Sequence, residues 1–123
     1  MTNDVIALLR GEPNRDALLR GLLAAGPQLR VGAIAEGAAL QLFDDDRTLV
    51  ATVELPAQIR VPGEAERLLD VTDPPAPPYW WVEIRCPTAR EDAVPVAVRL
   101  AQALAAELGG VVWRTPDPAD RSG

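Results

Sequence analysis

The sequence contains no histidine and no lysine, and its only serine is Ser122. Without histidine, neither a Ser-His-Asp triad nor a Cys-His pair can form, and zinc sites built from several histidine or cysteine ligands are excluded as well. Without lysine there is no Schiff-base chemistry and no Walker phosphate loop, and no Gly-x-Gly-x-x-Gly run occurs. Carboxylates, arginines, threonines, Tyr79 and Cys86 remain, so the sequence argues against an enzyme and predicts no cofactor.

Cysteine and long apolar runs are also scarce. The single Cys86 cannot form an internal disulfide, and a lone cysteine in an alternating strand is usually a small buried side chain. No apolar run reaches the ~20 residues of a membrane span, and the start Met1-Thr2-Asn3-Asp4 lacks the basic residues of a secretory signal. We therefore expect a cytoplasmic protein that does not contact a membrane.

The chain does have enough apolar residues for one core, and it has more acidic than basic residues. Hydrophobic residues make up 48% of its 123 residues, which predicts a single globular domain over residues 1–115, followed by a flexible tail at 116–123. The net charge of −6 opposes binding to nucleic acid and favours a basic partner. All twelve basic residues are arginine, and the composition, rich in alanine, arginine and proline, resembles that of actinobacterial proteins.

Three segments carry helical spacing or helix signals. The first covers about residues 3–25, interrupted by Gly11 and Pro13 and restarted at the capping residue Asn14. A short helix is expected at 63–70. The strongest helical pattern runs over 92–108, where the apolar residues keep a spacing of three to four and Gly109-Gly110 follows.

Between these helices the apolar residues alternate with a period of two. Residues 28–35, 40–43 and 48–55 predict an antiparallel three-strand meander, and further strands are expected at 79–86 and 111–114. The fold class is therefore α+β, a mainly antiparallel sheet with the helices packed largely on one face. The strand, helix, strand order from 79 to 114 is long enough for a crossover, which would let the last strand pair parallel to 79–86.

A proline run leads into the aromatic strand at 79–86. On this strand Trp80, Val82, Ile84 and Cys86 form the apolar face, which we expect to be the core face. The opposite face would expose Tyr79 and Trp81 beside the proline run, the kind of surface that anchors protein interfaces. The alternative is that Trp81 packs against the proline run or the first helix. The candidate partner-binding residues are Tyr79, Trp81, Pro77, Pro78, Glu83 and Arg85.

A second hypothesis uses carboxylates. Oxygen ligands for Mg²⁺ would converge if the acidic turn met the glutamate of the aromatic strand; the residues concerned are Asp44, Asp45, Asp46 and Glu83. The element order and Glu83-Ile84-Arg85 are similar to the core of the restriction-endonuclease-like family, whose Glu-x-Lys motif has arginine at its last position here. This resemblance implies a Mg²⁺-dependent hydrolase or nuclease.

The order of helices and strands also resembles the small acidic type III secretion chaperones, which are usually dimers. That resemblance implies a protein that binds another protein, and it leaves a homodimer open. With the acidic charge and the missing catalytic residue types, it favours a noncatalytic interaction module, which would be an adaptor, a secretion-chaperone-like protein or an immunity-like protein with a basic partner. The metal-dependent hydrolase is the alternative.

Overall fold

The computed structural model describes residues 2–26, 28–34, 39–69 and 74–115. The predicted tail at 116–123 and residue 70 of the predicted short helix lie outside these ranges. The helices are α1 (Arg15–Ala25), α2 (Glu64–Leu69) and α3 (Ala93–Leu108). The strands are β1 (Thr2–Leu9), β2 (Arg30–Ile34), β3 (Ala39–Phe43), β4 (Leu49–Glu54), β5 (Ala57–Ile59), β6 (Tyr79–Pro87) and β7 (Gly110–Arg114).

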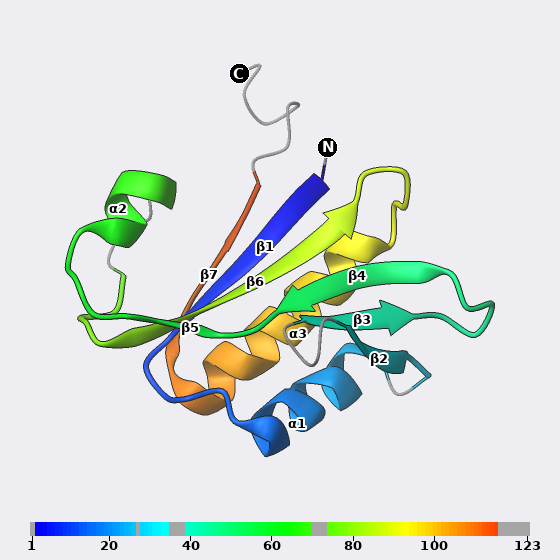
Figure 1. The fold of residues 1–123 in the computed structure, drawn as a ribbon, viewed down its shortest axis with the longest axis horizontal. Helices are drawn as coiled ribbons and strands as arrows, with labels where there is room; N and C mark the ends of the chain where they lie inside the picture. Colours follow the sequence, from blue (N-terminus) through cyan, green and yellow to red (C-terminus); the bar gives the residue numbers. More distant parts are fainter. Residues whose placement is uncertain (1, 27, 35–38, 70–73, 116–123) are drawn as a thin grey trace.

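All the strands belong to one antiparallel sheet, in the order β2-β3-β4-β6-β1-β7, and β5 pairs with the first half of β6. Helices α1 and α3 lie together on one face of this sheet (Figure 1). The predicted α+β class with a mainly antiparallel sheet is therefore confirmed. None of the helices in the described part of the chain has the length and apolar character needed to cross a membrane.

The first predicted helix is wrong over its first half, because residues 2–9 form the strand β1. The five residues Val5–Leu9 are at most 3% exposed, since β1 has β6 on one side and β7 on the other and is covered on both faces. A strand buried on both faces reads as a continuous apolar run, which periodicity cannot distinguish from a buried helix. The second half is confirmed: α1 follows Asn14, whose Oδ1 accepts a hydrogen bond from the N–H of Ala17 at 2.9 Å.

The expected parallel pairing of the last strand is also wrong. β7 runs in the same direction as β6, but β1 lies between them and pairs antiparallel with both. The junction into β7 depends on Gly110, which has a φ of 145° and lies so close to β1 that a Cβ would be 1.9 Å from the carbonyl oxygen of Leu8. Only glycine fits this backbone contact.

Two apolar cores result, one on each face of the sheet. The larger one fills the space between the sheet and helices α1 and α3, and it contains Val82, Ile84 and Cys86 of β6, as the alternation predicts. Burial raises the pKa of the Cys86 thiol to about 11, so this cysteine is an unreactive part of the core. The smaller core lies on the opposite face and includes Ala65 of α2. The helices are therefore not all on one face.

Helix α1 is attached to the molecule mainly through α3. A Cβ at Gly21 would be 2.8 Å from Leu100 Cδ1, so the absent side chain lets the two helices approach closely. Arg20 forms an ion pair with Glu107 of α3. From α3, Arg99 donates a hydrogen bond of 3.1 Å to the carbonyl oxygen of Ala25, at the end of α1. These contacts fix one side of α1, and the other side borders the candidate site.

Candidate functional site

An apolar groove of about 570 Å³ lies between α1 and the helix-side face of β2, β3 and β4. The sheet residues come from the alternation of the meander, in which Val31 is paired with Leu42, and Ala33 with Leu40. Helix α1 lies beside α3 (Figure 1), and the helix-side face of these strands is left partly uncovered at the groove. The residues lining it include Leu18, Leu19, Leu22, Val31, Leu40 and Val53.

Most of the exposed large apolar side chains lie on the elements that border this groove. Leu19, Val31 and Leu55 line it and are each about half exposed. Leu23 follows Leu19 by one helical turn, and Ile34 ends β2. Of the exposed large apolar residues found in the described ranges, only Val61 lies away from these elements, in the loop after β5. Exposed apolar side chains that gather around a depression are typical of binding surfaces.

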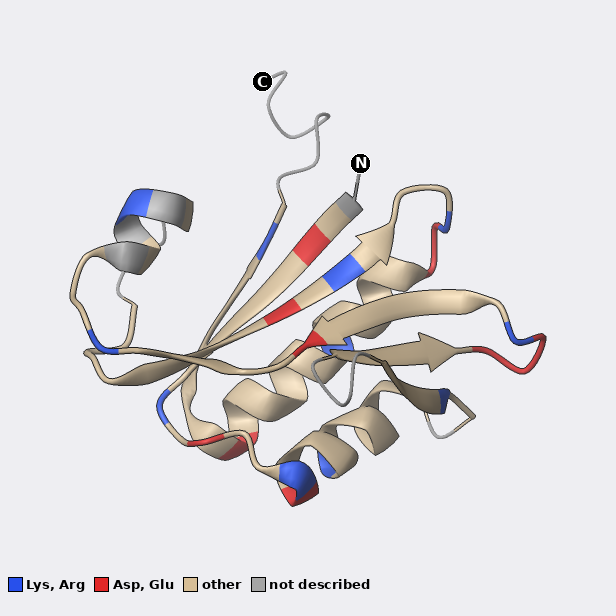
Figure 2. Ribbon diagram, viewed as in Figure 1, with Lys and Arg blue, Asp and Glu red and all other residues tan. Residues whose placement is uncertain are grey.

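The charges near the groove differ from those of the whole protein. Arg15 and Glu54 are the charged residues that line it, and Glu54 is held by Arg85, with 3.0 Å between Oε1 and Nε. Residues 13–34 contain three arginines and one aspartate, a net charge of +2 in a chain of −6. Acidic positions gather elsewhere, for example at the tip of the β3–β4 hairpin (Figure 2). The groove is therefore an apolar site and not an acidic one.

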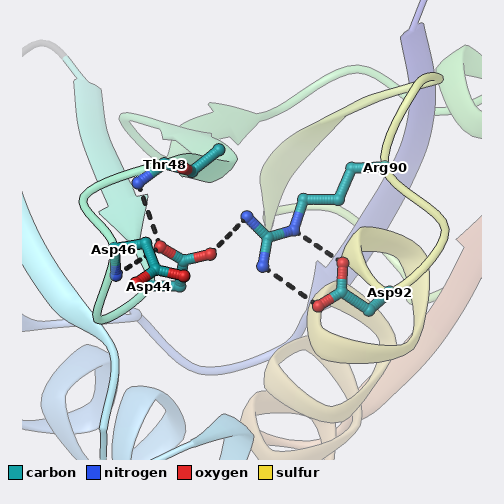
Figure 3. Close-up of polar contacts among 5 residues, drawn as sticks. All are labelled: Asp44, Asp46, Thr48, Arg90 and Asp92. Atoms are coloured by element: carbon teal, nitrogen blue, oxygen red, sulfur yellow. Dashed lines mark hydrogen bonds and ion pairs between the residues drawn. The ribbon is translucent and has the colours of Figure 1, made fainter.

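The acidic hairpin tip has a structural role in the described contacts. Figure 3 shows the Asp44 carboxylate accepting hydrogen bonds from the backbone N–H groups of Asp46 and Thr48, at 2.9 and 3.0 Å. Arg90 Nη1 lies 2.7 Å from Asp44 Oδ2, and the same guanidinium binds Asp92 through Nε at 2.6 Å. The hydrogen bond from Thr48, followed by that from Arg90, lowers the pKa of Asp44. We call Asp44, Arg90 and Asp92 the arginine latch.

The structure does not bring the four predicted metal-ligand candidates together. Glu83 lies on β6, where its Oε2 is 3.1 Å from Arg85 Nε. Its neighbour Ile84 pairs with Val53, so the whole length of β4, about 17 Å of strand, separates Glu83 from the turn that contains Asp44, Asp45 and Asp46. In the described ranges no three acidic, cysteine or histidine side chains are grouped as a metal ion would require.

The candidate contact face on β6 is partly covered. The expectation that Tyr79 exposes its ring is wrong, because Tyr79 is 2% exposed in the smaller core, beneath α2. Trp81 is half-buried and packs against the same core. Pro77 is half-buried and Pro78 is exposed. Whether these residues bind a partner stays a prediction, but the exposed aromatic pair on which it was based does not exist.

The other two candidates on that face form ion pairs: Arg85 contacts both Glu83 on its own strand and Glu54 on β4. Sequence reasoning did not identify the groove, because an apolar stripe on α1 and alternation on β2 are also what core elements show. Leu19 and Leu23, which widen the stripe of α1 beyond what one packed face needs, were the signal available in the sequence.

Comparisons of the chain with family models, with curated proteins and with solved structures found no match.

Proposed function

We propose that this protein is a noncatalytic protein–protein interaction module that holds an apolar segment of its partner in the groove between α1 and β2–β4. The observation that carries the proposal is the groove itself, with an apolar lining and half-exposed Leu19, Val31 and Leu55 at its mouth. Leaving these side chains in water costs free energy that a partner recovers, at about 25 cal/mol for each square ångström of apolar surface buried.

The volume of the groove suits a few side chains of a partner and not a whole folded domain. An amphipathic helix that presents residues at positions i, i+3 or i+4, and i+7 would fill it, as would an extended segment. This mode of binding is compatible with each of the three roles, adaptor, secretion chaperone and immunity protein. The net charge of −6 favours a basic partner at long range, whereas the groove supplies the apolar contact at short range.

A capture experiment with two matched variants tests the proposal. Leu55→Glu places a charge at the groove mouth, and Val61→Glu makes the same change at a side chain of similar exposure outside the groove. Both positions are exposed, so both variants should fold. We expect the wild type and Val61→Glu to recover the same partner from the source cells after cross-linking, and Leu55→Glu to bind that partner at least about tenfold more weakly, or 1.4 kcal/mol.

The purified partner, once identified by mass spectrometry, would be titrated against all three proteins by calorimetry. Equal affinity of Leu55→Glu and the wild type would show that the groove is not the contact surface. Equal loss in both variants would point to a general effect of added negative charge, which would also count against the groove.

A further inference from the structure

The outermost strand β2 leaves one edge of the sheet open. Among the described strands it pairs only with β3, so its other edge presents backbone N–H and C=O groups without a neighbouring strand. Proteins usually protect such edges with proline, bulges or inward-pointing charges. β2 contains no proline, and its one charged residue is Arg30 at its first position.

The side chains around this edge are apolar on both faces of the sheet. Val31 lies on the face that carries the helices and Ile34 on the opposite face, and on the helix side Leu19 of α1 lines the same groove as Val31. These three side chains are between 38% and 46% exposed. Together with the backbone of a five-residue edge they present on the order of a few hundred square ångströms, a part of the about 800 Å² that each partner contributes to a standard interface.

The edge is complementary to itself. Antiparallel pairing of β2 with a second β2 uses all five residues only when Gly32 faces Gly32 of the other copy, which places Val31 opposite Ala33 and Arg30 opposite Ile34. Val31 and Ala33 share the helix-side face, so the pairing would extend the apolar face of the sheet across both copies. The two Arg30 side chains would be about 14 Å apart along the strands, beyond the screening length of about 8 Å at physiological salt.

The charge distribution permits a second copy at this edge. Residues 13–34 carry a net charge of +2, which leaves −8 on the remainder of the chain. Of the three arginines in this segment, Arg20 is already paired with Glu107. Two copies of an acidic chain can therefore meet at α1 and β2 while their acidic surfaces stay apart.

From this geometry we infer that two copies of the chain associate through β2, forming a symmetric dimer with one continuous sheet and a helix α1 from each copy on the same face. Closed two-fold symmetry, with the same patch used by both copies, is the commonest arrangement of soluble oligomers. The dimer uses the open edge beside the groove, so it goes beyond the proposed function and does not depend on it.

Disulfide trapping in the purified full chain tests the pairing directly. The native Cys86 is buried, and a Cβ at Gly32 would make only an ordinary contact of 3.5 Å with Phe43. At the two-fold centre of an antiparallel pair the Cα atoms are about 4.5–5.5 Å apart, which permits a disulfide. We expect the Gly32→Cys variant to form a covalent dimer on mild oxidation, and Val61→Cys, an exposed cysteine outside the edge, to form no covalent dimer.

Light scattering and analytical ultracentrifugation over a dilution series supply the second measurement. We expect a mass of twice 13.2 kDa, with a dissociation constant on the order of micromolar. Val31→Arg should raise that constant at least about tenfold and Val61→Arg should not change it. Circular dichroism would confirm that both variants fold.

A protein that is monomeric at every concentration overturns the inference, and so does a dimer that Gly32→Cys cannot trap or that Val31→Arg does not weaken. Each of these outcomes leaves the groove proposal intact, because partner capture by the groove is measured separately with Leu55→Glu. Conversely, an unaltered partner affinity in Leu55→Glu would leave the dimer unaffected.

Discussion

Strands β1 and β2 are the two extremes of the sheet. β1 lies near its centre, paired on both sides, and Val5–Leu9 are buried. β2 forms one edge, and four of its five residues are exposed. Yet the alternation of β2 is the clearer strand pattern, whereas β1 resembles a helix. Hydrophobic alternation therefore reports how the two faces of a strand differ, and it weakens where both faces are buried in the same way.

The same contrast divides the molecule into a closed half around β1, β6, β7 and α3 and an open half around α1, β2, β3 and β4. In the closed half, β1 is paired on both sides and Val5–Leu9 are buried. In the open half, some apolar side chains, among them Leu19, Val31 and Leu55, are left about half exposed. Substitutions at matched residues should therefore cost very different amounts of stability in the two halves.

The largest effect is expected from Gly110→Ala. The new Cβ would overlap the carbonyl oxygen of Leu8, and the backbone there has a φ of 145°, so the junction between β1 and β7 must move. We expect a loss of about 4 kcal/mol or more in the free energy of unfolding, measured by urea denaturation. The matched control is Gly32→Ala in the open half, where the Cβ has room and the change should lie within about 1 kcal/mol. Similar losses of stability in Gly110→Ala and Gly32→Ala would contradict the difference between the closed and the open half.

A smaller effect is expected from Leu8→Ala. Leu8 is fully buried in the smaller core, so its truncation should leave a cavity and cost about 2–5 kcal/mol by the same measurement. Val31→Ala removes a half-exposed side chain from β2 and should cost less than about 1 kcal/mol. If Val31→Ala proved as damaging as Leu8→Ala, β2 would belong to the closed half.

The smallest effect concerns the arginine latch, which joins the two halves. The pKa values of Asp44 and Asp92 are lowered by hydrogen bonds to each carboxylate, so the folded protein binds fewer protons than the unfolded chain. The stabilisation is present above the unfolded pKa of about 3.9 and is lost as pH falls through the lower folded values. Unfolding free energies measured between pH 7 and pH 2 should therefore fall most steeply below about pH 4.

Asp44→Asn should reduce the loss of unfolding free energy at acid pH. Asp45→Asn makes the same charge change at the same turn and should leave that loss as it is in the wild type. Hydrogen exchange would show where the effect occurs: Arg90→Gln should speed exchange in β3 and β4 and leave β1 protected. An identical pH dependence in Asp44→Asn and Asp45→Asn would mean that the latch adds nothing to stability.

Much of the fold could be predicted because most elements differ between their faces. The meander, β6 and α3 each bury one face, and the period of their apolar residues identified them. The run Val5–Leu9 could not be assigned in this way. Nor could the burial of Tyr79, because it depends on α2 packing against the outer face, and the short sequence 63–70 does not specify the face on which it packs.

The candidate site was harder to predict than the fold. Periodicity shows which side chains turn toward the helix side of the sheet, but it does not show whether a helix then covers them. Leu19 and Val31 satisfy the same pattern whether they lie in a sealed core or at the mouth of a groove. What decides between the two is how α1 meets α3, including the close approach at Gly21, and this depends on residues nearly eighty positions apart in the chain.

The position of β1 between β6 and β7 also determines the order in which the protein can fold. β1 is the first element along the sequence, but its neighbours are residues 80–87 and 110–114, so its backbone stays unpaired until most of the chain has left the ribosome. The three-strand meander, by contrast, can close from local contacts as soon as it is made. Contacts of such long sequence separation slow folding, and during synthesis Val5–Leu9 remain an exposed apolar strand that depends on late residues for protection.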